Sequence, residues 1–106
     1  MKKQVLLLSS VFFLFAGVSC YKKTAVPVAD FSFQSSNDSV VPDTVTFRNL
    51  SQNATSYKWD FGDYHSSTET NPVHIYTIAG NYTIELKAYS DNKEQWAIKS
   101  GVINIK

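Results

Sequence analysis

The amino-acid sequence predicts an all-β fold, an antiparallel β-sandwich of at least five strands without a disulfide. Apolar and polar residues alternate with a period of two in several short runs, which is typical of strands with one buried face. Turn-forming residues separate these runs, and no helical periodicity follows Tyr21. The chain has 106 residues and a single cysteine, so no disulfide can form within it. Short strands at this spacing favour two packed sheets.

Five runs mark the strands in chain order. They lie at residues 29–34, 44–48, 57–61, 82–88 and 102–106. In the first run, Ala29, Phe31 and Phe33 are expected to form the buried face. The expected core combines aromatic and aliphatic side chains from the later runs, namely Phe47, Trp59, Phe61, Tyr82, Ile84 and Leu86.

The last strand contains a change of phase. Trp96 and Ile98 have the opposite parity to Ile103 and Ile105. A bulge near Gly101 would reconcile the two, because glycine inside a strand often marks one.

The first twenty residues differ from the rest. Lys2 and Lys3 precede an apolar stretch at 5–18 that is shorter than the roughly 20 residues a membrane helix needs. This order predicts a signal peptide at 1–19, with an uncleaved anchor helix as the alternative. The only cysteine, Cys20, follows directly, and residues 16–20 resemble a bacterial lipobox, although Gly17 departs from its usual leucine. We expect Cys20 to be lipidated, residues 20–28 to form a tether, and residues 29–106 to form the domain.

Three segments carry a family resemblance. Residues 59–63 (WDFGD) are similar to the WDFGDG signature of PKD domains, residues 71–76 to their NPxHxY segment, and residues 79–86 to their PGxYxVxL segment. The resemblance covers residues 29–106 and implies an immunoglobulin-like antiparallel sandwich of about seven strands. The residues on the motif are Trp59, Asp60, Phe61, Gly62, Asp63, Pro72, His74, Tyr76, Gly80 and Tyr82.

Most of these residues have a structural explanation. Asp60 faces away from the core and can accept hydrogen bonds from loop amides, and Gly62 permits the turn that ends the strand. His74 and Tyr76 suit a half-buried edge, and Gly80 is expected to close a tight turn.

Tyr64 departs from the family pattern, which has glycine at that position. Because a left-handed backbone disfavours tyrosine, we expect the loop to take another route and to leave Tyr64 exposed.

The sequence predicts a protein that is not an enzyme. The two histidines, His65 and His74, form no recognised catalytic or metal-binding spacing. No cofactor and no metal ligand is assigned; calcium at Asp60, Asp63 and Asp91 is the alternative, since the resemblance includes calcium-binding members. With a net charge of +1 and no basic stripe, nucleic acid is not an expected partner.

The resemblance implies an extracellular binding role. The chain is expected to be a lipoprotein anchored to a membrane of the cell envelope, facing the periplasm or the exterior, and to act as a protein-interaction or adhesion module. The alternatives are a polysaccharide-binding accessory lipoprotein and the first part of a longer secreted protein. Exposed aromatic residues would form the ligand surface, and the candidates are Tyr64, Tyr89 and Trp96.

Overall fold

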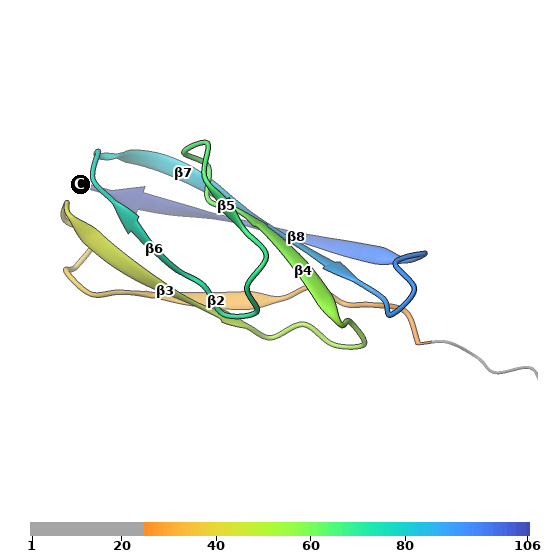
Figure 1. The fold of residues 1–106 in the computed structure, drawn as a ribbon. Coiled ribbons are helices and arrows are strands. Elements are labelled where there is room, and N and C mark those ends of the chain that lie inside the picture. The colour runs from red at the N-terminus through yellow and green to blue at the C-terminus, as the bar shows by residue number, and fades with distance from the viewer. Residues whose placement is uncertain (1–24) are drawn as a thin grey trace, which may run out of the picture.

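The computed structural model describes residues 25–106 as two antiparallel sheets that face each other (Figure 1). The predicted signal peptide, Cys20 and most of the predicted tether lie outside the described residues. Within residues 25–106, no helix is long and apolar enough to cross a membrane.

Seven strands build the sandwich, which confirms the predicted fold class. The three-stranded sheet has the order β2 (Phe31–Ser35), β3 (Asp43–Asn49) and β6 (Val73–Tyr76). The four-stranded sheet has the order β5 (Ser66–Ser67), β4 (Ser56–Asp60), β7 (Gly80–Tyr89) and β8 (Trp96–Ile105). An isolated bridge between Val28 and Gln52 ties the start of the domain to the rest.

The core lies between the two sheets and is made of one face of each strand. Its buried hydrophobic cluster consists of Val45, Phe47, Trp59, Phe61, Tyr76, Ile84, Leu86, Ile103 and Ile105. Five of the six predicted core residues are therefore buried, and the sixth, Tyr82, is partly buried against the cluster. All of this core lies within residues 25–106, so that segment contains a complete folding unit.

The first strand is less buried than the alternation predicts. The Phe33 side chain is 39% exposed, whereas Ala29 and Phe31 are half-buried and Phe31 packs against the core. The reason is position: β2 lies at the edge of its sheet and is paired only with β3, so fewer side chains cover it.

The predicted bulge near Gly101 is wrong. β7 and β8 pair residue for residue from Gly80–Ile105 to Tyr89–Trp96. Trp96 and Ile98 differ in parity from Ile103 because they face outward, on the solvent side of the sheet. Gly101 faces inward, where an added Cβ would come within 3.3 Å of the Phe31 ring, so its small size leaves space for that ring.

A buried carboxylate organises the connection between β2 and β3. Asp43 is fully buried at the start of β3. Its oxygens accept hydrogen bonds from the Ser35 hydroxyl at 2.7 Å and from the amides of Ser36 and Asn37 at 3.1 and 3.0 Å. A buried carboxylate with several donors is well satisfied, so Asp43 holds the end of β2 against the start of β3.

Candidate functional site

The candidate site begins at the end of β4, where the side chains of Trp59 and Phe61 point into the core. The Trp59 ring lies 5.4 Å from the Phe47 ring, and its indole N–H donates to the Glu69 carbonyl at 2.9 Å. Asp60 faces outward between them and accepts a hydrogen bond from the Gly62 amide at 2.9 Å, as the alternation predicts. This local geometry ends the strand and begins the loop that carries the polar groups.

Gly62 and Tyr64 both adopt a left-handed backbone in this loop. Gly62 has a φ of 83°, and a Cβ there would come within 2.6 Å of the Thr83 carbonyl oxygen, so only glycine fits. Tyr64 has a φ of 70°. The expectation that tyrosine would force another route is therefore wrong. A hydrogen bond from the Phe61 amide to the His65 carbonyl, 3.1 Å long, closes the loop and holds Tyr64 in this conformation.

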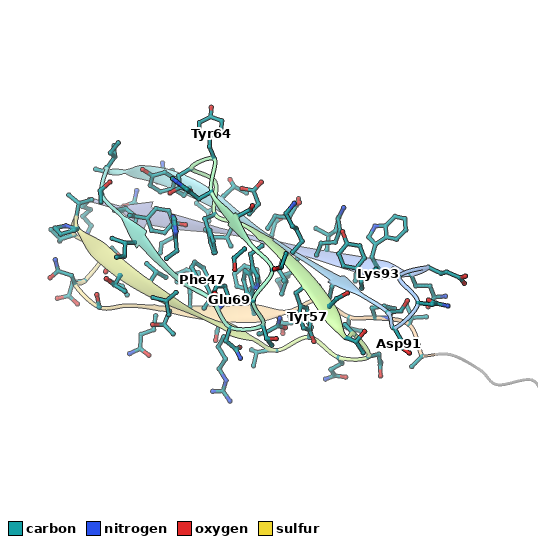
Figure 2. The ribbon with its side chains drawn as sticks, viewed as in Figure 1. Phe47, Tyr57, Tyr64, Glu69, Asp91 and Lys93 are labelled. Atoms are coloured by element: carbon teal, nitrogen blue, oxygen red, sulfur yellow. The ribbon has the colours of Figure 1, made fainter. Side chains whose placement is uncertain are left out.

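Tyr64 itself is fully exposed, as predicted. Figure 2 shows its ring projecting away from the body of the sandwich.

A polar network links this loop to edge strand β6. Asp63 Oδ2 lies 2.6 Å from His74 Nε2, and the His74 ring stacks on Phe61 with 4.3 Å between the ring centroids. The next inward residue of β6 is Tyr76, whose hydroxyl donates to the Phe61 carbonyl at 2.8 Å. His74 is partly buried as expected, but Tyr76 is fully buried, because its hydroxyl finds an acceptor inside the sandwich.

The charges of this network shift two pKa values. Burial raises the pKa of Asp63, but the hydrogen bond and charge of His74, followed by hydrogen bonds from His65, outweigh it and hold the pKa below its ordinary 3.8. Burial, followed by the charges of Asp63, Tyr82 and Asp60, raises the pKa of Tyr76 above its ordinary 10.0. Tyr76 is therefore a stable hydrogen-bond donor at neutral pH.

His65 completes a cluster that the sequence analysis missed. Its Nδ1 lies 3.4 Å from Asp63 Oδ1, and its ring centroid lies 5.5 Å from that of His74. The available signal was a histidine two residues after an aspartate in a loop that faces the NPxHxY segment. Only the fold brings His74 to that loop, because eight residues separate it from His65 along the chain.

The remaining motif residues support the framework. The Pro72 carbonyl accepts from the Phe47 amide at 2.9 Å, and the Tyr82 hydroxyl donates to the Ile78 carbonyl. Gly80 is not inside a turn: it is the first residue of β7 and pairs with Ile105.

The three aromatic surface candidates do not form one row. Tyr89 and Trp96 lie directly opposite each other where β7 and β8 meet their turn, and Tyr89 also pairs with Ser56 at the start of β4. Tyr64 follows the other end of β4. In Figure 2, Tyr64 is correspondingly distant from Lys93 in the β7–β8 turn.

The same arrangement separates the three carboxylates of the calcium alternative. Asp91 lies in the β7–β8 turn, as Figure 2 shows. Asp60 is the last residue of β4 and Asp63 follows it, at the end of β4 away from that turn. The structure does not bring the three together, and Asp60 is engaged with its own loop.

Comparisons with known proteins agree with this architecture. Residues 24–104 match the profile of the PKD domain. The solved PKD1 domain of Vibrio anguillarum Epp is similar at a TM-score of 0.67 and 27% identity, covering 79% of this chain and 98% of that one. The PKD1 domain from Vibrio cholerae metalloprotease PrtV gives 0.67 and 30%, covering 77% and 99%.

Curated relatives match over shorter stretches. Collagenase ColA of Bacillus cereus is 58% identical over 31 residues, which is 29% of this chain and 3% of that protein. Pre-pro-metalloprotease PrtV of Vibrio cholerae is 38% identical over 65 residues, which is 61% of this chain and 7% of that protein. The chain therefore spans only a few per cent of the length of these relatives.

Proposed function

Because this chain belongs to the PKD domain family, we propose that it is a non-enzymatic binding module of the bacterial cell envelope that engages a partner protein through the outer face of β8. The proposal assigns it no proteolysis, since its matches cover 3% and 7% of the collagenase and the metalloprotease.

The observation that carries the proposal is a row of apolar side chains on the outer face of β8. Trp96, Ile98 and Val102 all point to solvent, with exposed fractions of 54%, 49% and 63%. They share one face of one strand and form an apolar stripe that is interrupted only at Ser100. Such stripes on a soluble domain mark interaction sites, and aromatic residues are enriched at protein interfaces.

The backbone of β8 adds to this surface. Among residues 25–106, β8 pairs only with β7, so its other edge offers free amides and carbonyls over ten residues. An extended partner segment can add to such an edge while its side chains contact the stripe.

A polysaccharide is the second candidate, favoured by a pocket beside Tyr89. The pocket has a volume of about 380 Å³ and is lined by Ser56, Tyr57, Lys58, Thr68, Tyr89 and Lys93. The buried Ser56 hydroxyl has no hydrogen-bond partner within the described part of the chain. A tyrosine face beside polar groups suits the stacking and hydrogen bonding that a sugar ring requires.

Anchoring through Cys20 is part of the proposal. Its support is the position of the only cysteine at the end of the apolar stretch. Mass spectrometry of the membrane fraction should find an acylated Cys20 as the mature N-terminus, and Cys20→Ser should abolish membrane fractionation. An unmodified Cys20 rejects the anchor.

The binding proposal is tested by capture from the solubilised envelope of the producing bacterium and by a polysaccharide panel. The test variant is Trp96→Ser with Val102→Ser. The matched control is Val73→Ser with Ile75→Ser, which removes two exposed apolar residues from β6. Loss of a captured protein by the β8 variant alone supports the proposal. Polysaccharide binding that Tyr89→Ala abolishes favours the second candidate. Equal capture of proteins by the β8 and β6 variants contradicts the first candidate, and polysaccharide binding unchanged by Tyr89→Ala contradicts the second.

A further inference from the structure

The loop after β4 and edge strand β6 place one carboxylate and two imidazoles at one corner of the sandwich. They belong to Asp63, His65 and His74, and their ligand atoms all lie within 4.8 Å of one another. We propose that this corner binds a divalent transition-metal ion of the Zn²⁺ class.

The donor set selects the class of metal. Two imidazole nitrogens and one carboxylate oxygen are a set that Zn²⁺ accepts, with a fourth position left for water or a partner's side chain. Ca²⁺ instead requires six to eight oxygen ligands, which this corner does not offer among the described residues. Imidazole also suits Cu²⁺ and Ni²⁺, so these ions should compete for the site.

Two of the three ligands are already held in place. The His74 side chain is only 14% exposed, because its ring lies between the parallel face of Phe61 and the edge of Tyr76. These contacts direct Nε2 toward Asp63, at 2.6 Å. Asp63 is fixed in turn by the His65 amide, which donates to its Oδ1 at 3.2 Å. Fixed ligands reduce the ordering cost of binding.

The third ligand is able to move. The His65 side chain is 72% exposed, while its backbone is held by the hydrogen bond from Phe61. Ligands of a tetrahedral Zn²⁺ with bonds of about 2.0–2.1 Å lie about 3.3 Å apart. The His74–Asp63 contact must therefore open by about 0.7 Å, and a rotation of the exposed His65 ring can bring its nitrogen closer.

His65 is the residue that distinguishes a metal site from a structural contact. His74 and Asp63 lie in the fold motifs and already connect the loop to β6. His65 lies outside the motifs, and its side chain is 72% exposed. Fold maintenance therefore does not account for a second imidazole beside this carboxylate.

The test uses residues 25–106, which contain the complete core and omit the Cys20 thiol, without a polyhistidine tag. Zinc chloride is titrated by calorimetry at pH 7.5 into the wild type, His65→Ala, His65→Gln and the distant control Asp91→Asn. We expect one Zn²⁺ per chain, an affinity at least about tenfold weaker in both His65 variants, and no change in Asp91→Asn. In the same titration followed by NMR, the imidazole signals of both histidines should shift together.

Two results would overturn the site. One is the absence of saturable Zn²⁺ binding up to 1 mM, a concentration chosen as the limit of the titration. The other is an unchanged affinity in His65→Ala whose circular dichroism matches the wild type. Calcium chloride provides the comparison for donor type, and binding of Ca²⁺ as tight as that of Zn²⁺ contradicts a site based on imidazole.

Discussion

The two tryptophans occupy opposite environments in one sheet. Trp59 lies on β4, between β5 and β7, and is fully buried beneath the other sheet. Rings of Phe31, Phe47 and Phe61 lie 5.3, 5.4 and 6.5 Å from it. Trp96 lies at the first position of edge strand β8 and is 54% exposed. The same side chain thus stabilises the fold in one place and is available to a partner in the other.

The difference follows from strand position and parity. Trp59 faces inward, so the opposite sheet covers it. Trp96 faces outward and has a cross-strand neighbour, Tyr89, on one side only. Both tryptophans lie in alternating runs, so residue type alone does not separate buried from exposed aromatic residues.

The largest expected effect is the loss of stability on removing Trp59, compared with the small loss on removing Trp96. Trp59→Ala should cost about 3–5 kcal/mol, which approaches the whole stability of a small domain, so the variant should be largely unfolded. Trp96→Ala should cost less than about 1 kcal/mol, because half of its surface already faces water. Urea unfolding measures the free energy of unfolding of both variants. Equal losses of this free energy would place Trp96 in the core.

Gly62 tests whether the backbone near Trp59 is as constrained as the side chains packed around that tryptophan. Gly62→Ala should cost about 2 kcal/mol or more, because its Cβ would meet the Thr83 carbonyl oxygen at 2.6 Å with φ at 83°. Gly80→Ala is the matched control: its Cβ would have no neighbour nearer than the Tyr82 ring at 3.6 Å. Thermal unfolding compares the two, and a Gly62→Ala protein as stable as Gly80→Ala contradicts the clash.

Tyr76 tests the buried polar contacts of the core. Tyr76→Phe removes the hydroxyl that donates to the Phe61 carbonyl and leaves that buried acceptor unpaired, at a cost of about 1–2 kcal/mol. Tyr82→Phe removes a more exposed hydrogen bond and should cost less. The order of the two urea midpoints decides the prediction, and a reversed order would refute it.

The Asp63–His74 contact should give a pH-dependent effect. Because the pKa of Asp63 is lower in the folded state than in the unfolded state, its contribution to stability is present above the ordinary value of 3.8 and is lost as pH falls through the folded pKa. In EDTA, the difference in unfolding free energy between wild type and Asp63→Asn should shrink as the pH falls below about 4. A difference that stays constant down to pH 3 would contradict this assignment.

The smallest effect is expected at Tyr64. Glycine would remove the strain of the left-handed backbone at residue 64, but it would also increase the conformational entropy of the unfolded chain. Tyr64→Gly should therefore stabilise the domain by less than about 1 kcal/mol. Tyr64→Ala retains the strained backbone and should give no gain. Differential scanning calorimetry can resolve the two, and a larger gain for Tyr64→Ala would mean that exposure of the ring, rather than φ, determines the cost.

Alternation predicted the long strands and the core because burial imposes a period of two on them. It could not predict β5, with two residues, because so short a strand shows no period. It also mistook the outward Trp96 and Ile98 for a phase error, because these exposed apolar residues alternate in the same way as core residues. The Asp63–His65–His74 cluster was out of reach for a different reason: its two histidines meet only when β6 packs beside the loop after β4.

The buried carboxylate of Asp43 has a consequence for how β2 and β3 find their alignment. Seven residues separate the two strands, and a loop of that length does not fix which residues pair. A slip by one residue would turn Phe47 from the core to solvent and would also separate the carboxylate from its donors on Ser35, Ser36 and Asn37. A misaligned hairpin is therefore penalised twice, through the hydrophobic surface exposed at Phe47 and through the hydrogen bonds that the Asp43 carboxylate loses. Replacing Asp43 with alanine should make misaligned hairpins more frequent during refolding, even in molecules that eventually reach the native sandwich.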